Sequence, residues 1–212
     1  MLSVPLVLSI PPSMQLTDEQ FLALCEINSD LYLERNLKTG EIFIKTPVGG
    51  ETGNRNFSLI VQLGIWVKQD QTGIGFDSST GFRITGASKE PMSPDAAWVR
   101  LERWNTLTAE QKRKFPPICP DFVVELRSPS DTLTSLQKKM EEWIKLGVQL
   151  GWLIDRIGRK VYIYHHDGSQ LEFRLVRGAK LQSLTIRKIK NQSLSGWNAD
   201  WGGQKLTVKG SI

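Results

Sequence analysis

The stretch PDFVVELRSPSD, residues 120–131, contains an apolar β-strand with a carboxylate inside it. Phe122–Leu126 has the composition of a buried strand, yet Glu125 lies within it. Because side chains alternate along a strand, we expect Arg127 on the same side as Glu125. A buried carboxylate is costly unless it is paired or binds a metal. The stretch therefore predicts a buried strand of a central sheet, in which Glu125 either forms an ion pair or binds a cation.

Helix and strand signals alternate on both sides of this stretch. Thr17 and Gln20 have the spacing of a capping box at the start of a helix. A Lys-Thr-Gly turn joins residues 31–36 and 41–46 as a hairpin. The other expected elements are helices near residues 54–69 and 133–146 and strands at residues 73–76, 81–84, 94–99, 150–155, 160–165 and 171–176. This order predicts an α/β protein with a mixed central β-sheet flanked by α-helices.

Composition limits the class of protein. The 212 residues are 40% hydrophobic and 23% charged, which is typical of a globular domain and argues against extensive disorder. The two cysteines, Cys25 and Cys119, follow no metal-binding or redox spacing, so we expect both to be reduced. No apolar run approaches the ~20 residues of a membrane span, and the N-terminus lacks the features of a signal peptide. The sequence thus predicts a cytoplasmic protein with no membrane partner.

Charge is unevenly distributed along the chain. Residues 133–212 hold 14 Lys and Arg residues against 6 Asp and Glu residues, within a total net charge of +5. A basic half would attract a polyanion such as nucleic acid. Solubility is the simpler explanation of this feature when it is taken alone.

Two Pro-Asp pairs, at Asp95 and Asp121, each begin an apolar strand. Asp121 precedes Glu125 by four residues on one strand, which separates the two by roughly 13 Å, too far to share a small cation. Asp95 begins another strand, and adjacent strands lie only ~4.8 Å apart. If the two strands are neighbours, Asp95 and Glu125 meet. Two carboxylates with open positions suit Mg²⁺ or Mn²⁺, which prefer oxygen ligands and retain several waters.

A cation beside this pair would stabilise negative charge that develops on a phosphoryl group. The candidates are Arg127 and a lysine of the helix at residues 133–146. The apolar face of that helix consists of Leu133, Leu136, Met140, Trp143 and Ile144. At ~100° per residue, Lys138 and Lys145 point away from this face, whereas Lys139 lies at its edge and can reach the end of strand 121–127.

Structural alternatives exist for each of these residues. Asp95 and Asp121 could simply begin strands after proline, and Lys139 could extend along the rim of the core. Glu125 could pair with Arg127 or Lys139 without any metal, because ion-pair networks also place charges inside folds.

Five motifs resemble, in order and approximate spacing, the Uma-type family of bacterial putative restriction endonucleases. They are PVGGETGNRN (47–56), SPDAAWV (93–99), PDFVVELRSPSD (120–131), LQKKMEEW (136–143) and GVQLGWLID (147–155). The resemblance runs from Leu16 to Leu194. It implies the PD-(D/E)XK nuclease superfamily and its restriction-endonuclease-like fold. It also implies a nuclease domain at residues 16–194, between an N-terminal extension (1–15) and an irregular C-terminal tail (195–212).

The resemblance implies that Asp95 and Glu125 bind Mg²⁺ or Mn²⁺, with Glu51 as a further acidic ligand. The superfamily lysine two residues after the acidic ligand is replaced by Arg127, so Lys139 is the expected substitute and Arg127 a further catalytic candidate that could bind a phosphate oxygen. The implied activity is metal-dependent hydrolysis of phosphodiester bonds in DNA by a homodimer. The alternative is a catalytically impaired nuclease-like scaffold that binds nucleic acid or a protein partner, because arginine substitutes poorly for a water-activating lysine.

Overall fold

The computed structural model describes residues 6–174, 176–177, 198–201 and 204–207. Its centre is a six-stranded sheet formed by β4 (Gly73–Asp77), β6 (Ala96–Arg100), β7 (Phe122–Leu126), β8 (Leu150–Asp155), β9 (Lys160–His165) and β10 (Gln170–Arg174). The strands lie in the order β10-β9-β8-β7-β6-β4. β7 and β8 run parallel, and the other neighbouring pairs are antiparallel. The predicted mixed sheet is therefore confirmed.

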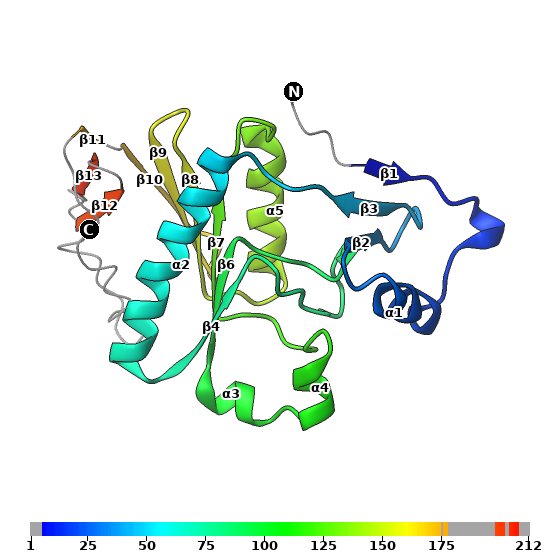
Figure 1. Cartoon of the computed structure of the whole chain (residues 1–212). Coiled ribbons are helices and arrows are strands. Elements are labelled where there is room, and N and C mark those ends of the chain that lie inside the picture. Colours follow the sequence, from blue (N-terminus) through cyan, green and yellow to red (C-terminus); the bar gives the residue numbers. More distant parts are fainter. Residues whose placement is uncertain (1–5, 175, 178–197, 202–203, 208–212) are drawn as a thin grey trace.

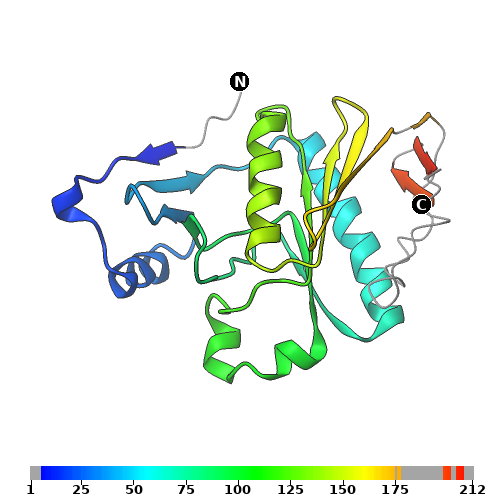
Figure 2. The same ribbon diagram turned by 180° about the vertical axis from the view of Figure 1, so that it is seen from behind.

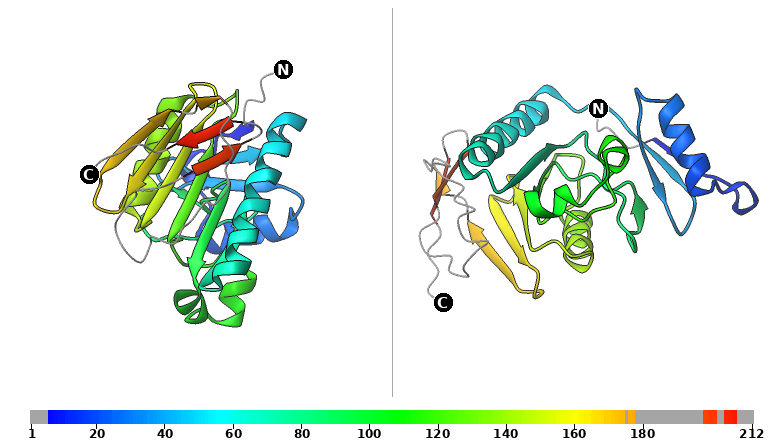
Figure 3. Two further views of the ribbon diagram at one scale, coloured as in Figure 1. Left: turned by 90° about the vertical axis from the view of Figure 1, so that its left-hand side faces the viewer. Right: turned by 90° about the horizontal axis from the view of Figure 1, so that it is seen from below.

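Two helices cover opposite faces of this sheet (Figure 1; Figure 3, right). α5 (Leu133–Lys145) is the crossover that the parallel pair β7–β8 requires, and α2 (Gly50–Asp70) covers the other face. Alternate residues of β7 divide between the two cores: Val124 packs in the cluster that contains Leu59 of α2, and Val123 packs with Trp143 of α5. By this alternation Glu125 belongs to the α5 face.

A second, four-stranded sheet projects to one side of the molecule (Figure 2). It consists of β1 (Leu6–Leu8), β3 (Ile42–Lys45), β2 (Tyr32–Asn36) and β5 (Lys89–Glu90), in that order. The 31–36/41–46 hairpin is thus confirmed as β2 and β3. β1, which lies in the predicted N-terminal extension, pairs with β3. α1 (Asp18–Ile27) packs on this sheet, and its first turn has the predicted capping box of Thr17 and Gln20.

A buried arginine links α1 to the second sheet through hydrogen bonds. Arg35 of β2 is 4% exposed and donates to Asp18 at 2.6 Å, to Glu90 at 3.2 Å and to the carbonyl oxygen of Leu16 at 2.8 Å. Arg83 pairs with both carboxylates as well. The network holds α1, β2 and β5 together, because a buried guanidinium needs acceptors for its N–H groups.

Two predicted elements differ from the structure. The helix expected near residues 54–69 begins at Gly50, because burial of Leu59, Leu63 and Trp66 outweighs the low helix propensity of the glycines in its first turns. Residues 81–84 form no strand; they make one isolated bridge, Phe82 to Met92, because the next amide, that of Arg83, donates instead to Pro116. The segment between β6 and Pro120 contains α3 (Leu101–Asn105) and α4 (Ala109–Arg113).

Short strands occur near the C-terminus. β11 (Val176–Arg177), β13 (Gln204–Thr207) and β12 (Asn198–Trp201) form a three-stranded sheet in that order. The sequence predicted an irregular tail at residues 195–212, and its described residues instead pair antiparallel from Asn198↔Thr207 to Trp201↔Gln204. The predicted domain boundary at residue 194 lies outside the described residues. Among the helices that the structure describes, none has the length and apolar character needed to span a membrane.

Candidate functional site

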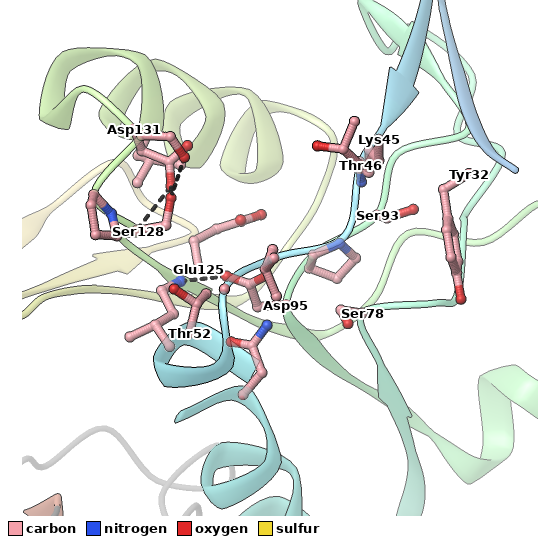
Figure 4. Close-up of a pocket in the computed structure, with 18 of the residues that line it drawn as sticks. Tyr32, Lys45, Thr46, Thr52, Ser78, Ser93, Asp95, Glu125, Ser128 and Asp131 are labelled. Carbon is pink, nitrogen blue, oxygen red and sulfur yellow. Dashed lines mark hydrogen bonds between the residues drawn. The ribbon is translucent and has the colours of Figure 1, made fainter. Parts of the chain in front are cut away.

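A pocket of about 630 Å³ opens between the start of β6, the end of β7, the start of α2 and the side of α5 (Figure 4). Its walls include four of the five predicted site residues: Glu51, Asp95, Glu125 and Lys139. The second, four-stranded sheet contributes Tyr32 of β2 and Lys45 of β3. The pocket therefore brings together residues that are up to 107 positions apart in the chain, from Tyr32 to Lys139.

Asp95 and Glu125 lie on neighbouring strands, as the sequence predicted. β6 pairs with β7 in the register Ala96↔Val124, and the amide of Asp95 donates to the carbonyl oxygen of Val124 at 3.1 Å. One step further along this antiparallel register places Asp95 opposite Glu125. Figure 4 shows the two side chains beside each other, with Thr52 of α2 close by. Both carboxylates therefore line the same pocket.

Glu125 is 2% exposed and is held from α5. Its Oε1 atom accepts a hydrogen bond from Lys139 Nζ at 2.8 Å and another from the indole Nε1 of Trp143 at 2.9 Å. These two donors explain how a carboxylate can lie within an apolar strand, because a buried charge needs both a counter-charge and hydrogen bonds. The sequence pattern places Trp143 on the apolar face of its helix and does not reveal this contact.

Asp95 is held by the backbone of the neighbouring strand. Its Oδ2 atom accepts from the amide of Leu126 at 2.6 Å. Burial and the adjacent negative charge of Glu125 raise the pKa of Asp95 to about 7, although Lys139 and the Leu126 amide act in the opposite direction. Two carboxylates that repel each other in a partly enclosed space form a site that attracts a cation.

Lys139 of α5 contacts both of the chain segments that provide the carboxylates. Its Nζ atom also donates to the carbonyl oxygen of Ser93, at 2.9 Å, two residues before Asp95. Burial lowers the pKa of Lys139, but the charges of Glu125 and Glu34 outweigh that effect, so its pKa is raised and it stays protonated. The neighbouring Lys138 is exposed. The helical periodicity thus distinguished these two lysines correctly.

Glu34 is a charged neighbour of the site that the sequence did not reveal. It lies on β2, is 9% exposed and pairs with Lys45 at 2.7 Å and with Lys89 at 3.8 Å. Burial raises the pKa of Glu34, but the positive charges of Lys45 and Lys139 have the larger, opposite effect, so the pKa of Glu34 is lowered overall. The sequence LYLERN places this glutamate on a strand, but only the packing of the second sheet brings it near Lys139.

Arg127 is bound elsewhere. Its Nη1 atom donates to both carboxylate oxygens of Asp155, at 3.2 Å each, and its Nε atom donates to the carbonyl oxygen of Asp131 at 3.3 Å. Asp155 ends the neighbouring parallel strand β8 and is 1% exposed. Arg127 is not among the described residues that line the pocket. The ion pair between Arg127 and Asp155 therefore links the neighbouring strands β7 and β8.

Glu51 and Asp121 have contrasting positions. Glu51 lies in the first turn of α2, is exposed, lines the pocket and pairs with Arg55 one turn later. Asp121 is 2% exposed, pairs with Arg103 at 2.8 Å and accepts from the amide of Arg100 at 2.9 Å. These contacts make Asp121 a structural residue at the start of β7, and it lies outside the described lining of the pocket.

The donor set fits a hard divalent cation. Oδ1 of Asp95 and Oε2 of Glu125 accept no hydrogen bond within the described part of the chain, and the pocket also contains a buried amide oxygen, Oδ1 of Asn56, without a partner there. The described residues hold no group of three or more His, Cys, Asp or Glu side chains arranged around a metal. A cation would thus have two carboxylate ligands and complete its shell with water, as Mg²⁺ commonly does.

The mixed sheet, its two flanking helices and the carboxylate pair at the ends of β6 and β7 define the restriction-endonuclease-like class of protein. Residues 18–194 match the Uma2 family, described as "Putative restriction endonuclease", and the chain belongs to this family.

Comparison with solved structures supports the fold. The chain is similar to "a putative nuclease belonging to DUF820" from Anabaena variabilis ATCC 29413, with a TM-score of 0.60 and 21% sequence identity. The similarity covers 80% of this chain and 89% of that one. At this identity the comparison establishes the fold alone, and it confirms the predicted one. Among proteins with curated descriptions, none matches the chain.

Proposed function

We propose that this protein is a Mg²⁺- or Mn²⁺-dependent endonuclease that hydrolyses phosphodiester bonds in DNA. The observation that carries the proposal is the meeting of Asp95, Glu125 and Lys139 in one pocket, with one oxygen of each carboxylate left without a protein donor among the described residues. Membership of the Uma2 family and the fold of a protein titled as a nuclease support the same activity.

Asp95 and Glu125 would hold the divalent cation. When bound, such a cation polarises a phosphoryl oxygen and lowers the pKa of a coordinated water. Lys139 keeps its positive charge beside both carboxylates and is fixed by Ser93, so it provides a preorganised charge for the phosphate without rearrangement. Glu51, at the mouth of the same pocket, is the candidate for a further, outer ligand.

Arg127 takes no direct part in this scheme. Its guanidinium is bound to Asp155 and to the carbonyl oxygen of Asp131. The positive charge that the resemblance places on the strand is therefore provided by α5, through Lys139. DNA as the substrate and a homodimer as the assembly belong to the same proposal, and sedimentation of the purified protein tests the second of these.

A nuclease-like scaffold without cleavage activity is the second candidate. The observation that favours it is the engagement of Arg127 with Asp155, because the strand position that carries a lysine in the superfamily then offers no cation to the carboxylate pair. Such a protein would bind nucleic acid or a protein partner and leave the phosphodiester bond intact.

Cleavage assays separate the two candidates. Plasmid DNA and single-stranded DNA are incubated with the protein and Mg²⁺ or Mn²⁺, and RNA serves as the substrate control. We expect metal-dependent cleavage of DNA that is abolished in Glu125→Ala and retained in Glu141→Ala, a substitution of an exposed glutamate on the same helix. DNA binding without cleavage in either metal would favour the scaffold. Cleavage that survives Glu125→Ala would show that another site carries the activity.

A further inference from the structure

Both hydrogen bonds to Glu125 fall on the same oxygen. Lys139 and Trp143, one turn apart on α5, donate to Oε1 at 2.8 and 2.9 Å. The Oε2 atom accepts no hydrogen bond within the described residues, and Glu125 lines the pocket. A carboxylate with two donors on one oxygen is restrained in rotation about its terminal torsion, which is otherwise broad.

We propose that Trp143 is a positioning residue, whose indole N–H fixes the carboxylate of Glu125 so that Oε2 is presented to the divalent cation. The inference rests on the proposed metal site at Asp95 and Glu125. It assigns a role to a residue that touches neither metal nor substrate, because a hydrogen-bond donor to a metal-binding side chain orients that side chain toward the metal.

Trp143 is better suited than Lys139 to keep this orientation once a cation is present. The ammonium of Lys139 and the cation carry like charges and repel each other at short distance. Lys139 also divides its donors between Glu125 and a second acceptor, the carbonyl oxygen of Ser93. The indole N–H is neutral and directional, so its bond to Oε1 persists when the charge of Glu125 is shared with a metal.

The indole is also held rigidly. Trp143 is fully buried, at 0% exposure, and packs in the cluster of the α5 face with Val123, Met140 and Leu153. Cores are close-packed, so a ring of this size has little freedom to turn. Its N–H therefore has one fixed direction, toward Glu125.

A simpler explanation is that Glu125 merely satisfies a buried indole. Trp98 of β6 argues against that explanation, because its Nε1 atom is buried without a hydrogen-bond partner among the described residues. The fold thus accepts an unpartnered indole N–H on its other face. Trp98 is 3% exposed and provides a matched control, since Trp98→Phe removes a buried indole but no hydrogen bond to a carboxylate.

The test measures Mn²⁺ affinity by titration calorimetry for the wild-type protein, Trp143→Phe and Trp98→Phe, without DNA. We expect Trp143→Phe to bind Mn²⁺ about tenfold more weakly, which is the lower end of the effect of removing a hydrogen-bond donor to a metal ligand. Trp98→Phe should bind within about twofold of the wild type. Urea unfolding of both variants shows whether their losses of stability are comparable, so that a general loss of structure is separated from a specific loss of affinity.

A second readout uses the wild-type chain. With ¹⁵N-labelled tryptophan, the indole resonance of Trp143 should shift during titration with Mg²⁺, whereas that of Trp98 should not. This measurement decides the question if Trp143→Phe fails to fold. Equal affinities of Trp143→Phe and the wild type, or an indole resonance of Trp143 that ignores Mg²⁺, would overturn the role of Trp143. A wild-type protein that binds neither cation would instead overturn the metal site on which the inference rests.

Discussion

Lys139 of α5 contacts Glu125 of β7 on the face of the sheet that α5 covers, with 2.8 Å between Nζ and Oε1. The two residues are 14 positions apart, and the crossover helix between the parallel strands β7 and β8 brings them together. Arg127, which follows Glu125 by two positions, pairs with Asp155 of β8 instead. The helix therefore provides the cation at this carboxylate, and the strand arginine links the sheet.

Lys139→Ala should lower the rate of DNA cleavage by ~10²-fold or more, because it removes a fixed positive charge next to the reacting phosphate. Lys138→Ala is the matched control, since Lys138 is exposed on the same helix. We expect it to weaken DNA binding slightly and to reduce its salt dependence at most. Single-turnover cleavage rates measure both. Similar rates for the two variants, or loss of cleavage in Arg127→Ala with Lys139→Ala active, would show that Lys139 is not the catalytic cation.

Asp95→Asn should weaken Mn²⁺ binding by about tenfold or more, because it removes one of the two ligand carboxylates. Asp121→Asn should leave the affinity nearly unchanged and lower the free energy of unfolding by about 2 kcal/mol, since Asp121 is buried against Arg100 and Arg103, both partly exposed. Calorimetry and urea unfolding give the two quantities. Equal losses of affinity would mean that the wrong Pro-Asp pair had been chosen.

Asp95→Asn should also stabilise the metal-free protein at pH 8. Burial and Glu125 raise the pKa of Asp95 to about 7, so the folded state holds this proton more tightly than the unfolded state does. Its contribution to stability is present at low pH and is lost as the pH rises from about 4 to about 7. At pH 8 the variant should therefore be more stable than the wild type, and near pH 4 the difference should vanish. Thermal unfolding in EDTA measures the effect, and a variant less stable than the wild type at pH 8 would contradict it.

Glu34→Gln should change acid stability with the opposite sign. The pKa of Glu34 is lowered in the fold: burial opposes this shift, but Lys45 and Lys139 outweigh it. Its stabilising contribution is present above the unfolded pKa of about 4.5 and is lost as the pH falls through the lower folded value. We expect the variant to be less stable than the wild type at pH 7 and to approach it near pH 3. An unchanged free energy of unfolding at pH 7 would show that the pairing with Lys45 contributes nothing net.

Local periodicity was sufficient to predict much of this protein. The alternation along Phe122–Leu126 identified a buried strand with an internal carboxylate, and the spacing of two strands favoured Asp95 over Asp121 as its neighbour. The 100° step of a helix separated Lys139 from Lys138. These features depend on the geometry of one element or of two adjacent ones, and that geometry is nearly invariant among proteins.

Only the tertiary structure determined which groups each charge meets. The sequence left open whether Glu125 pairs with Arg127 or with Lys139, and the parallel pairing of β7 with β8 gives Arg127 a different partner, Asp155. The indole of Trp143 belonged to an apolar face in the sequence pattern, and the packing of α5 directs its N–H to Glu125. A buried charge takes the partner with the best distance and geometry in three dimensions. That partner depends on strand order and helix packing, which no local period of the sequence encodes.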